Sequence, residues 1–205
     1  GYLDFEKTIK ILRVRGEAMQ NSVPKGEGGM LAVLGVKIKD IEKILRDNKK
    51  KFNAQIANDN SEGQIVLSGK NKDLESLSNF LKDNKIKNIK LPVSAPFHCE
   101  LMTKATEIMK KELEKVDFKK SNNTLISNVT ADEILDVKYL KNLLISQIEK
   151  RVRWRESIIN MVNYGVTQFI EIGPGKVLSG LIKRIDKDVK ITSINNQSDI
   201  ESLEI

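Results

Sequence analysis

The chain has 205 residues, of which 40% are hydrophobic and 31% charged, as is typical of a globular protein in water. Its longest apolar run, residues 30–36, is much shorter than the roughly 18 residues that cross a bilayer, so we expect no membrane span. The single cysteine, Cys99, excludes an internal disulfide framework, and with a single histidine it is too small a set for an ordinary zinc site. We therefore expect a cytoplasmic protein without a bound metal.

The formal net charge is +7. The basic residues are mostly lysines scattered over predicted helix faces, and aromatic residues that could stack on bases make up only 5% of the chain. This pattern favours an acidic protein partner over nucleic acid.

Residues 4–20 predict a helix that begins after Asp4, a suitable N-cap. Its apolar side carries Phe5, Ile9, Leu12 and Met19 at helical spacing. Arg15 falls on the same side of this helix. It is either a snorkelling or structurally paired side chain or an inward-facing ligand for an anion, because a guanidinium group binds a carboxylate through two parallel hydrogen bonds.

The next stretch predicts strand, helix, strand, strand, helix and strand. The corresponding segments are 29–36, 38–51, 52–59, 63–69, 71–84 and 86–93. This is the order of a ferredoxin-like unit.

Helices and strands alternate through the rest of the chain. We predict helices from behind His98 to about Val116, near 137–149 and 154–164, and at 175–185, and strands at 124–129, 167–173 and 189–194. Such alternation indicates a parallel α/β sheet, so the fold class is α/β with a ferredoxin-like insert.

His98 lies where a strand-like run meets a helix, which is a common place for a reactive side chain. A lone histidine is either a packed structural residue or a general base.

The turn at 173–176, GPGK, lacks the spacing of a phosphate-binding loop, and we predict a tight glycine turn there. Neither Ser68 nor Ser179 lies in a G-x-S-x-G elbow, so the residues supply a candidate base and a candidate anion ligand but no nucleophile.

Several segments together resemble the bacterial malonyl-CoA:acyl-carrier-protein transacylase family. They are RGEAMQ (15–20), VPKGEGGMLAVLG (23–35), GQIVLSG (63–69), LPVSAPFHCELM (91–102), ISNVT (126–130), VRWRESI (152–158) and FIEIGPGKVLSGLIKRI (169–185). The resemblance implies an α/β-hydrolase-like subdomain at 1–26 and 93–205 and a ferredoxin-like insert at 27–92. It also implies that the first part of the larger subdomain, with the GHSLGE serine elbow and the GQGSQ loop, lies upstream of Gly1.

The resemblance assigns roles to four residues. Arg15 would bind the malonyl carboxylate, and His98 would be the general base for the serine. Gln147 would offer its main-chain carbonyl to His98, and Phe97 would favour malonyl over branched acyl groups.

The implied activity is transfer of a malonyl group from malonyl-CoA to the phosphopantetheine thiol of acyl carrier protein in fatty-acid biosynthesis. No cofactor or metal is expected, and the enzyme would be a monomer that binds neither membrane nor nucleic acid. Two alternatives remain: an acyltransferase domain of a polyketide synthase, and a non-catalytic fragment that only binds acyl carrier protein.

Overall fold

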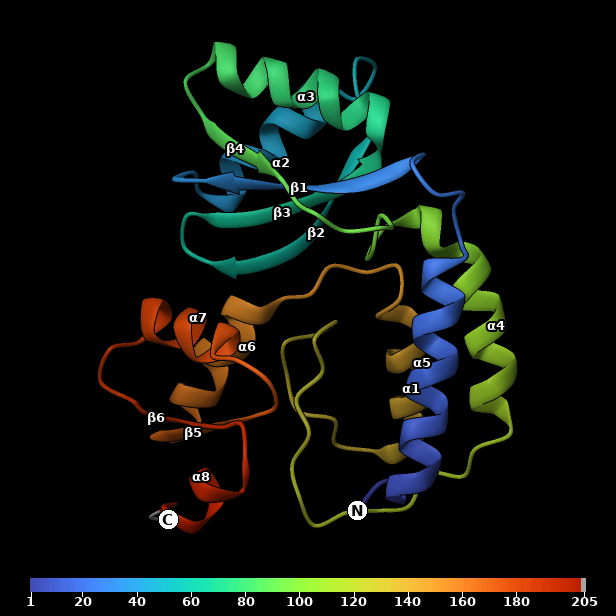
Figure 1. Cartoon of the computed structure of the whole chain (residues 1–205), viewed down its shortest axis with the longest axis vertical. Coiled ribbons are helices and arrows are strands. Elements are labelled where there is room, and N and C mark those ends of the chain that lie inside the picture. Colours follow the sequence, from blue (N-terminus) through green and yellow to red (C-terminus); the bar gives the residue numbers. More distant parts are fainter. Residues whose placement is uncertain (204–205) are drawn as a thin grey trace.

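The computed structural model describes residues 1–203, which form two lobes (Figure 1). One lobe, here called the sheet lobe, contains a four-stranded sheet and two helices. The second lobe holds all the other helices and a two-stranded sheet. No helix within residues 1–203 is both long enough and apolar enough to cross a membrane.

The sheet lobe has the predicted ferredoxin-like order. Its strands lie side by side as β2-β3-β1-β4, and every neighbouring pair is antiparallel. The elements are β1 (Gly28–Leu34), α2 (Ile38–Asp47), β2 (Ala54–Ser61), β3 (Gln64–Lys70), α3 (Asn71–Asp83) and β4 (Lys87–Lys90). The mixed α/β fold class is thus confirmed, whereas the subdomain boundaries at 26/27 and 92/93 stay a prediction.

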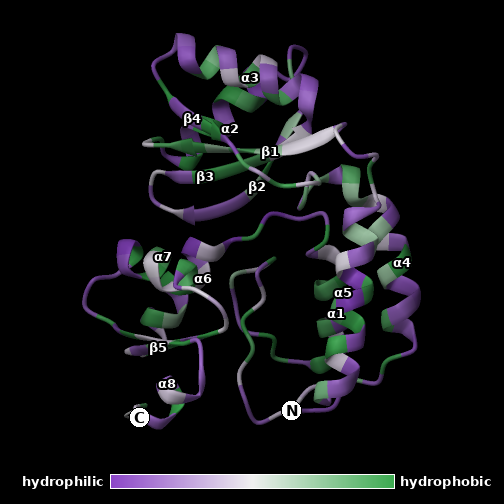
Figure 2. Cartoon of the chain, in the orientation of Figure 1, coloured by the Kyte–Doolittle hydropathy of each residue, from purple (hydrophilic) through white to green (hydrophobic). Residues whose placement is uncertain are grey.

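Both faces of the central strand β1 are covered. Leu31 and Val33 belong to a cluster with buried residues of α2 and α3. Met30 lies in a second cluster with Ala57 and Val66, against which Phe97 packs. Figure 2 shows hydrophobic colour along these strands and on the inner side of the helices. The sheet therefore has a helix-covered face and another face that contacts the segment around His98.

The first helix of the second lobe is α1 (Phe5–Gln20), and Asp4 caps it by accepting a 2.8 Å hydrogen bond from the Lys7 N–H. The end of α1 packs with η1 (Glu100–Met102), α4 (Thr103–Glu114) and the region of α5 (Val137–Ser146). The predicted apolar face is buried only there. Phe5 is 81% exposed and Leu12 57% exposed, whereas Ile11, on another side of the helix, packs against the cluster that contains Met109 and Leu113 of α4.

The other side of this lobe is a parallel βαβ unit. It comprises α6 (Trp154–Asn163), β5 (Gln168–Ile172), α7 (Val177–Ile185), β6 (Lys190–Ile194) and α8 (Gln197–Glu201). Strands β5 and β6 pair in parallel, as the alternation of elements predicts.

The predicted strand at 124–129 is wrong. The chain instead folds back on itself, with Ile126 and Glu133 in an isolated bridge and Ala131 in a left-handed turn conformation. The turn satisfies its own backbone groups, since Ser127 N–H donates to Asp132 O and Ala131 N–H to Ser127 O. A segment whose polar groups are paired locally has none left for a sheet neighbour.

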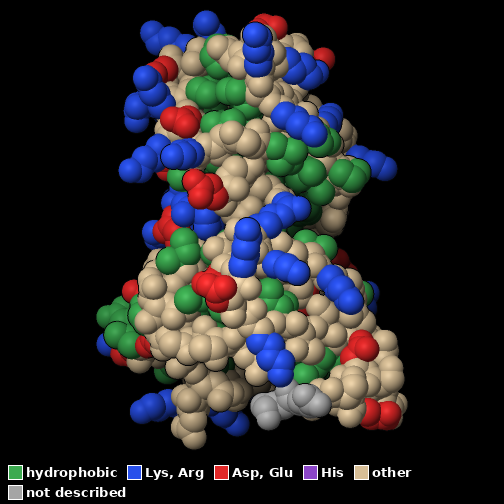
Figure 3. All heavy atoms as spheres, turned by 90° about the vertical axis from the view of Figure 1, so that its left-hand side faces the viewer, with side chains coloured by type: hydrophobic (Ala, Val, Ile, Leu, Met, Phe, Trp, Pro, Cys, Tyr) green, Lys and Arg blue, Asp and Glu red, His purple; other side chains and the backbone are tan. Residues whose placement is uncertain are grey.

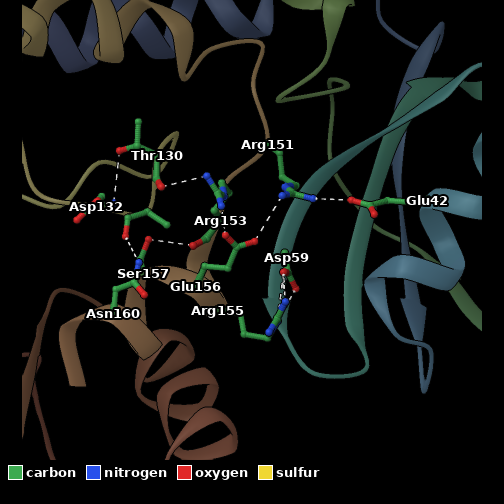
Figure 4. Close-up of polar contacts among 11 residues, drawn as sticks. Glu42, Asp59, Thr130, Asp132, Arg151, Arg153, Arg155, Glu156, Ser157 and Asn160 are labelled. Carbon is green, nitrogen blue, oxygen red and sulfur yellow. Dashed lines mark hydrogen bonds and ion pairs between the residues drawn. The ribbon is translucent and has the colours of Figure 1, made fainter. Parts of the chain in front are cut away.

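The two lobes join along β2. Val152 N–H donates to Ala57 O at 2.8 Å, and Asp59 N–H donates to Val152 O at 2.9 Å, so residue 152 pairs with the outer edge of the sheet. Beside this pairing, the Nε–H and Nη2–H groups of Arg155 both donate to the carboxylate of Asp59, whose side chain is only 1% exposed (Figure 4). Hydrogen bonding by Asp59 raises the pKa of Arg155.

Loss of the arginine from this pair should destabilise the protein strongly. Arg155→Met leaves the buried Asp59 carboxylate without its partner, and we expect the free energy of unfolding to fall by about 3–5 kcal/mol. Denaturant unfolding measures this. The matched control is Arg46→Met, which removes an exposed pair with Asp47 and should cost less than about 1 kcal/mol.

A second variant separates the lost pairing from lost packing. The double change Asp59→Leu with Arg155→Met removes both charges, so most of the stability should return. Equal costs for Arg46→Met and Arg155→Met would contradict this account.

Candidate active site

His98 lies in a turn between β4 and η1, and its backbone is strained. Its φ is +59°, in the left-handed region that a non-glycine residue seldom occupies. The turn approaches β1 closely at Gly28, where an added Cβ would lie 2.4 Å from Pro96 Cγ. Glycine at position 28 is therefore what allows residues 95–98 to lie against the sheet.

The imidazole ring is held by a main-chain carbonyl. Its Nδ1 lies 2.8 Å from the carbonyl oxygen of Gln147, and because a carbonyl can only accept, Nδ1–H is the donor. Gln147 is the C-cap of α5, where helix carbonyls lack a partner within the helix. The neutral ring is thereby fixed as the tautomer whose Nε2 carries a free lone pair.

Burial sets the protonation state of His98. Desolvation lowers its pKa, the charge on Arg15 lowers it further, and hydrogen bonding to the Gln147 and Lys150 backbone opposes these effects. The net direction is downward, so the ring is neutral near pH 7 and Nε2 is available to take a proton.

Arg15 faces a cavity of about 320 Å³ between α1, α4 and α5. The same cavity is lined by Gln147 and otherwise mainly by apolar side chains, among them Leu12 and Leu113. No carboxylate within residues 1–203 forms a salt bridge with Arg15, and burial lowers the pKa of its guanidinium group. A partly buried guanidinium group without a counter-ion can bind an anion.

The structure brings three of the four predicted site residues together. His98 and Gln147 are hydrogen-bonded, Arg15 lines the same cavity as Gln147, and the charge on Arg15 contributes to lowering the pKa of His98. Phe97 does not line the Arg15 cavity. It is partly buried and packs between the cluster containing Met19 and the cluster containing Met30.

Sequence reasoning missed a second set of residues near His98. A cavity of about 370 Å³ is lined by His98, Gln55 and Ile56, together with Glu42, Leu45, Glu100, Glu149, Lys150 and Arg151.

Three arginines of the segment 151–155 alternate along the chain. Arg151 binds Glu42 and Glu156, Arg153 binds Glu156 and Thr130 O, and Arg155 binds Asp59 (Figure 4). The alternating arginines at 151, 153 and 155 were the signal in the sequence that could have pointed to these ion pairs.

The glycine turn at 173–176 does not present a free anion site. Gly173 and Gly175 both have positive φ, as a tight turn requires. The first N–H groups of the following helix α7 already donate to a carboxylate, from Leu178 and Ser179 to Glu171 at 3.0 and 2.7 Å. Hydrogen bonding by Ser179, and secondarily by Leu178, holds the pKa of Glu171 below its usual range.

No group of three or more His, Cys, Asp or Glu side chains within residues 1–203 is arranged to hold a metal ion. Cys99, next to His98, is buried, donates to Pro96 O at 3.1 Å, and has a pKa raised by burial. It is therefore a poor nucleophile, and it does not form a dyad with its neighbour.

The site thus consists of a neutral, carbonyl-held histidine beside a cation without a counter-ion, in a mixed α/β fold. Among the known proteins to which this chain is similar in sequence or structure, three illustrate the match. The malonyl CoA-acyl carrier protein transacylase of Bacillus subtilis (strain 168) is 42% identical over 203 residues, which are 98% of this chain and 64% of that protein. An acyl carrier protein S-malonyltransferase structure from Vibrio cholerae is 35% identical with a TM-score of 0.93, covering 100% of this chain and 67% of that one.

The third is a structure of a malonyl-transacylase in complex with its type II polyketide acyl-carrier protein. It is 30% identical with a TM-score of 0.92, and the match covers 98% of this chain and 66% of that one. No family model matches the sequence. The chain belongs to the malonyl CoA-acyl carrier protein transacylases, and it spans 64% of the length of the Bacillus subtilis relative.

Because His98 is the only histidine, its titration can be followed directly by proton NMR of the ring. We expect a midpoint below the ordinary value of 6.5. Arg15→Met should raise the midpoint by removing one of the two effects that lower it. The control Arg13→Met, on the same helix but exposed and paired with Glu17, should leave it unchanged. A midpoint at or above 6.5 in the unchanged chain would refute the described environment.

The same shift has a consequence for stability. Since the folded pKa lies below that of the unfolded chain, the unfolded state takes up the proton first as the pH falls. The contribution of His98 to the free energy of unfolding is therefore complete above about pH 6.5 and declines below it.

Proposed function

We propose that the protein carrying this chain transfers a malonyl group from malonyl-CoA to the phosphopantetheine thiol of an acyl carrier protein in fatty-acid biosynthesis. The observation that carries the proposal is the Nδ1–H bond from His98 to the Gln147 carbonyl, with Arg15 beside it. This arrangement supplies a base and a carboxylate ligand at one place. The nucleophile would be a serine from a part of the protein outside these 205 residues.

In the first half-reaction, Nε2 of His98 takes the proton of the serine hydroxyl as its oxygen attacks the thioester carbonyl. The C–S bond breaks, the CoA sulfur receives the proton from the imidazolium, and a malonyl-serine ester remains. The imidazolium that forms in between is stabilised by the Gln147 carbonyl, at the negative end of α5. A main-chain carbonyl thus does the work that a carboxylate does in a Ser-His-Asp triad.

The second half-reaction reverses these steps with a different thiol. His98 accepts the proton of the carrier's phosphopantetheine thiol, the sulfur attacks the ester, and the serine leaves with the proton. Only C–S and C–O bonds form or break, and only protons move between the oxygen, nitrogen and sulfur atoms. We therefore propose no cofactor beyond the two substrates.

Arg15 would select the acyl group. A malonyl carboxylate can accept two hydrogen bonds from its guanidinium group, whereas a neutral acyl group leaves that charge partly buried and unpaired. Phe97 would restrict branching beside the thioester. Its packing between two core clusters supports this role, because a side chain held on both sides cannot move aside readily.

The proposed partner is an acidic acyl carrier protein. The net charge of +7 supports this choice, as does the carrier-bound relative. Basic side chains occur over both lobes of the face shown in Figure 3, interspersed with acidic ones. We further propose that the protein is a monomer and that it is located in the cytoplasm; the single, buried cysteine supports this location.

Replacement of Arg15 should change substrate choice more than it changes catalysis. In the whole protein, Arg15→Ala should lower kcat/KM for malonyl-CoA by roughly 10- to 100-fold, the worth of a charge-assisted pair. Acetyl transfer should fall less or rise. Arg13→Ala is the control and should alter neither. Equal loss of both activities would remove Arg15 from malonyl recognition.

Replacement of His98 should prevent formation of the acyl-enzyme. With radiolabelled malonyl-CoA, His98→Ala should leave no label on the protein after denaturation, while carrier binding persists. This result also distinguishes an enzyme from a module that only binds the carrier, since such a module carries no label in either form. Label that persists at the parental rate in His98→Ala would exclude His98 as the base.

A further inference from the structure

Strand β2 contacts both sides of the His98–Gln147 hydrogen bond. On the histidine side, Gln55 of β2 extends to the turn that follows His98, where its Oε1 accepts a 2.7 Å hydrogen bond from the Glu100 N–H. Gln55 is partly buried and lines the same cavity as His98. One amide side chain of the sheet lobe thus anchors the backbone two residues beyond the imidazole.

This anchor acts on a strained segment. His98 is left-handed, Cys99 returns to extended backbone with φ −145°, and Glu100 begins the short helix η1. The first N–H groups of a helix have no partner within it, and a left-handed non-glycine residue persists only where its neighbours hold it. Gln55 satisfies one of these N–H groups and thereby fixes where the strained turn ends.

The carbonyl side depends on the same strand. Val152, five residues after Gln147, is bonded to Ala57 and Asp59, and Arg155 is bonded to the Asp59 carboxylate. A bulge between Ile56 and Asn58 interrupts the pairing of β2 with β3 at this point. Bulges commonly redirect a strand next to a functional site. Donor and acceptor of the catalytic hydrogen bond are therefore both positioned by residues 55–59.

We propose that Gln55 is a positioning residue for His98. By accepting the hydrogen bond from the Glu100 N–H, Gln55 holds the imidazole of His98 against the Gln147 carbonyl. The proposal rests on His98 being the general base. Gln55 itself need not touch the substrate. In its absence the turn relaxes, the Nδ1–H bond is made for a smaller fraction of the time, and Nε2 is aimed less well.

The best probe is Gln55→Met. Methionine has nearly the shape of glutamine but no oxygen that can accept from Glu100. It also leaves unchanged every charge that faces the ring, namely Arg15 of α1 and, around the shared cavity, Glu42, Glu100, Glu149, Lys150 and Arg151. The matched control is Gln64→Met on β3, because Gln64 accepts from Arg184 instead.

The readout is the pair of ring nitrogen shifts of His98, the only histidine, in the ¹⁵N-labelled 205-residue chain. We expect Gln55→Met to lower the fraction of Nδ1–H tautomer and move the titration midpoint toward 6.5, while Gln64→Met keeps the parental values. Gln55→Glu retains an acceptor oxygen and should restore the tautomer. In the whole protein, Gln55→Met should lower kcat about fivefold, the factor of a single neutral hydrogen bond, with KM unchanged.

Ring shifts of Gln55→Met that match those of the parent and of Gln64→Met would overturn the proposal. A second measurement needs no variant. The Glu100 amide should exchange with deuterium at least tenfold more slowly than an unprotected amide, and exchange at the unprotected rate would also overturn it. Neither readout measures malonyl transfer, so they test positioning by Gln55 separately from the role of His98 as the base. Either proposal can fail while the other holds.

Discussion

The hydrogen bond from Nδ1 of His98 to the Gln147 carbonyl is the interaction on which the candidate site depends. It joins residues 49 positions apart and fixes the tautomer of the ring. It also uses a carbonyl that the end of α5 leaves without a helical partner. A carbonyl cannot be protonated at ordinary pH, so this support does not weaken when the medium becomes acidic. Burial and Arg15 meanwhile keep the ring neutral.

The sheet lobe contacts the chain on both sides of this bond. Its outer strand β2 pairs with Val152, and its Asp59 carboxylate is paired with Arg155. Buried ion pairs contribute little net stability but are costly to break, so they act mainly on geometry. The buried cluster of Met30, Ala57 and Val66 meets Phe97 on the same face of the sheet. Packing and polar contacts thus position one short segment together.

Much of the architecture could be predicted from the sequence because local signals were strong. Asp4 caps α1 as expected, and the alternation in residues 29–93 gave the correct ferredoxin-like order. The prediction of a strand at 124–129 was wrong. The alternation of apolar residues there is the same as in a strand, whereas hydrogen bonds within the turn decide the structure. The helix α1 was predicted correctly, but helical periodicity shows which face is apolar and not whether another element covers it.

For the site, the sequence offered Arg15 and His98 as candidates that carry charge or a titratable proton, and the resemblance added Gln147 and Phe97. Gln55 gave no such signal, because a neutral amide on a strand has no distinctive pattern and its partner is a backbone N–H 45 residues away. The ion pair of Asp59 and Arg155 was equally hidden, since its members are separated by 96 positions. Contacts of this range follow from the packing of the two lobes.

The antiparallel pairing of β1 with β4 bears on the order in which the chain folds. This pairing, which includes Leu31 opposite Lys90, brings together the two ends of the sheet lobe and so draws the end of α1 toward the start of α4. Closing a loop of that length in an unfolded chain costs about 3–4 kcal/mol of entropy. Once the sheet lobe has folded, α1 and α4 can pack together without that loss of entropy. We therefore expect the sheet lobe to fold before α1 and α4 pack together.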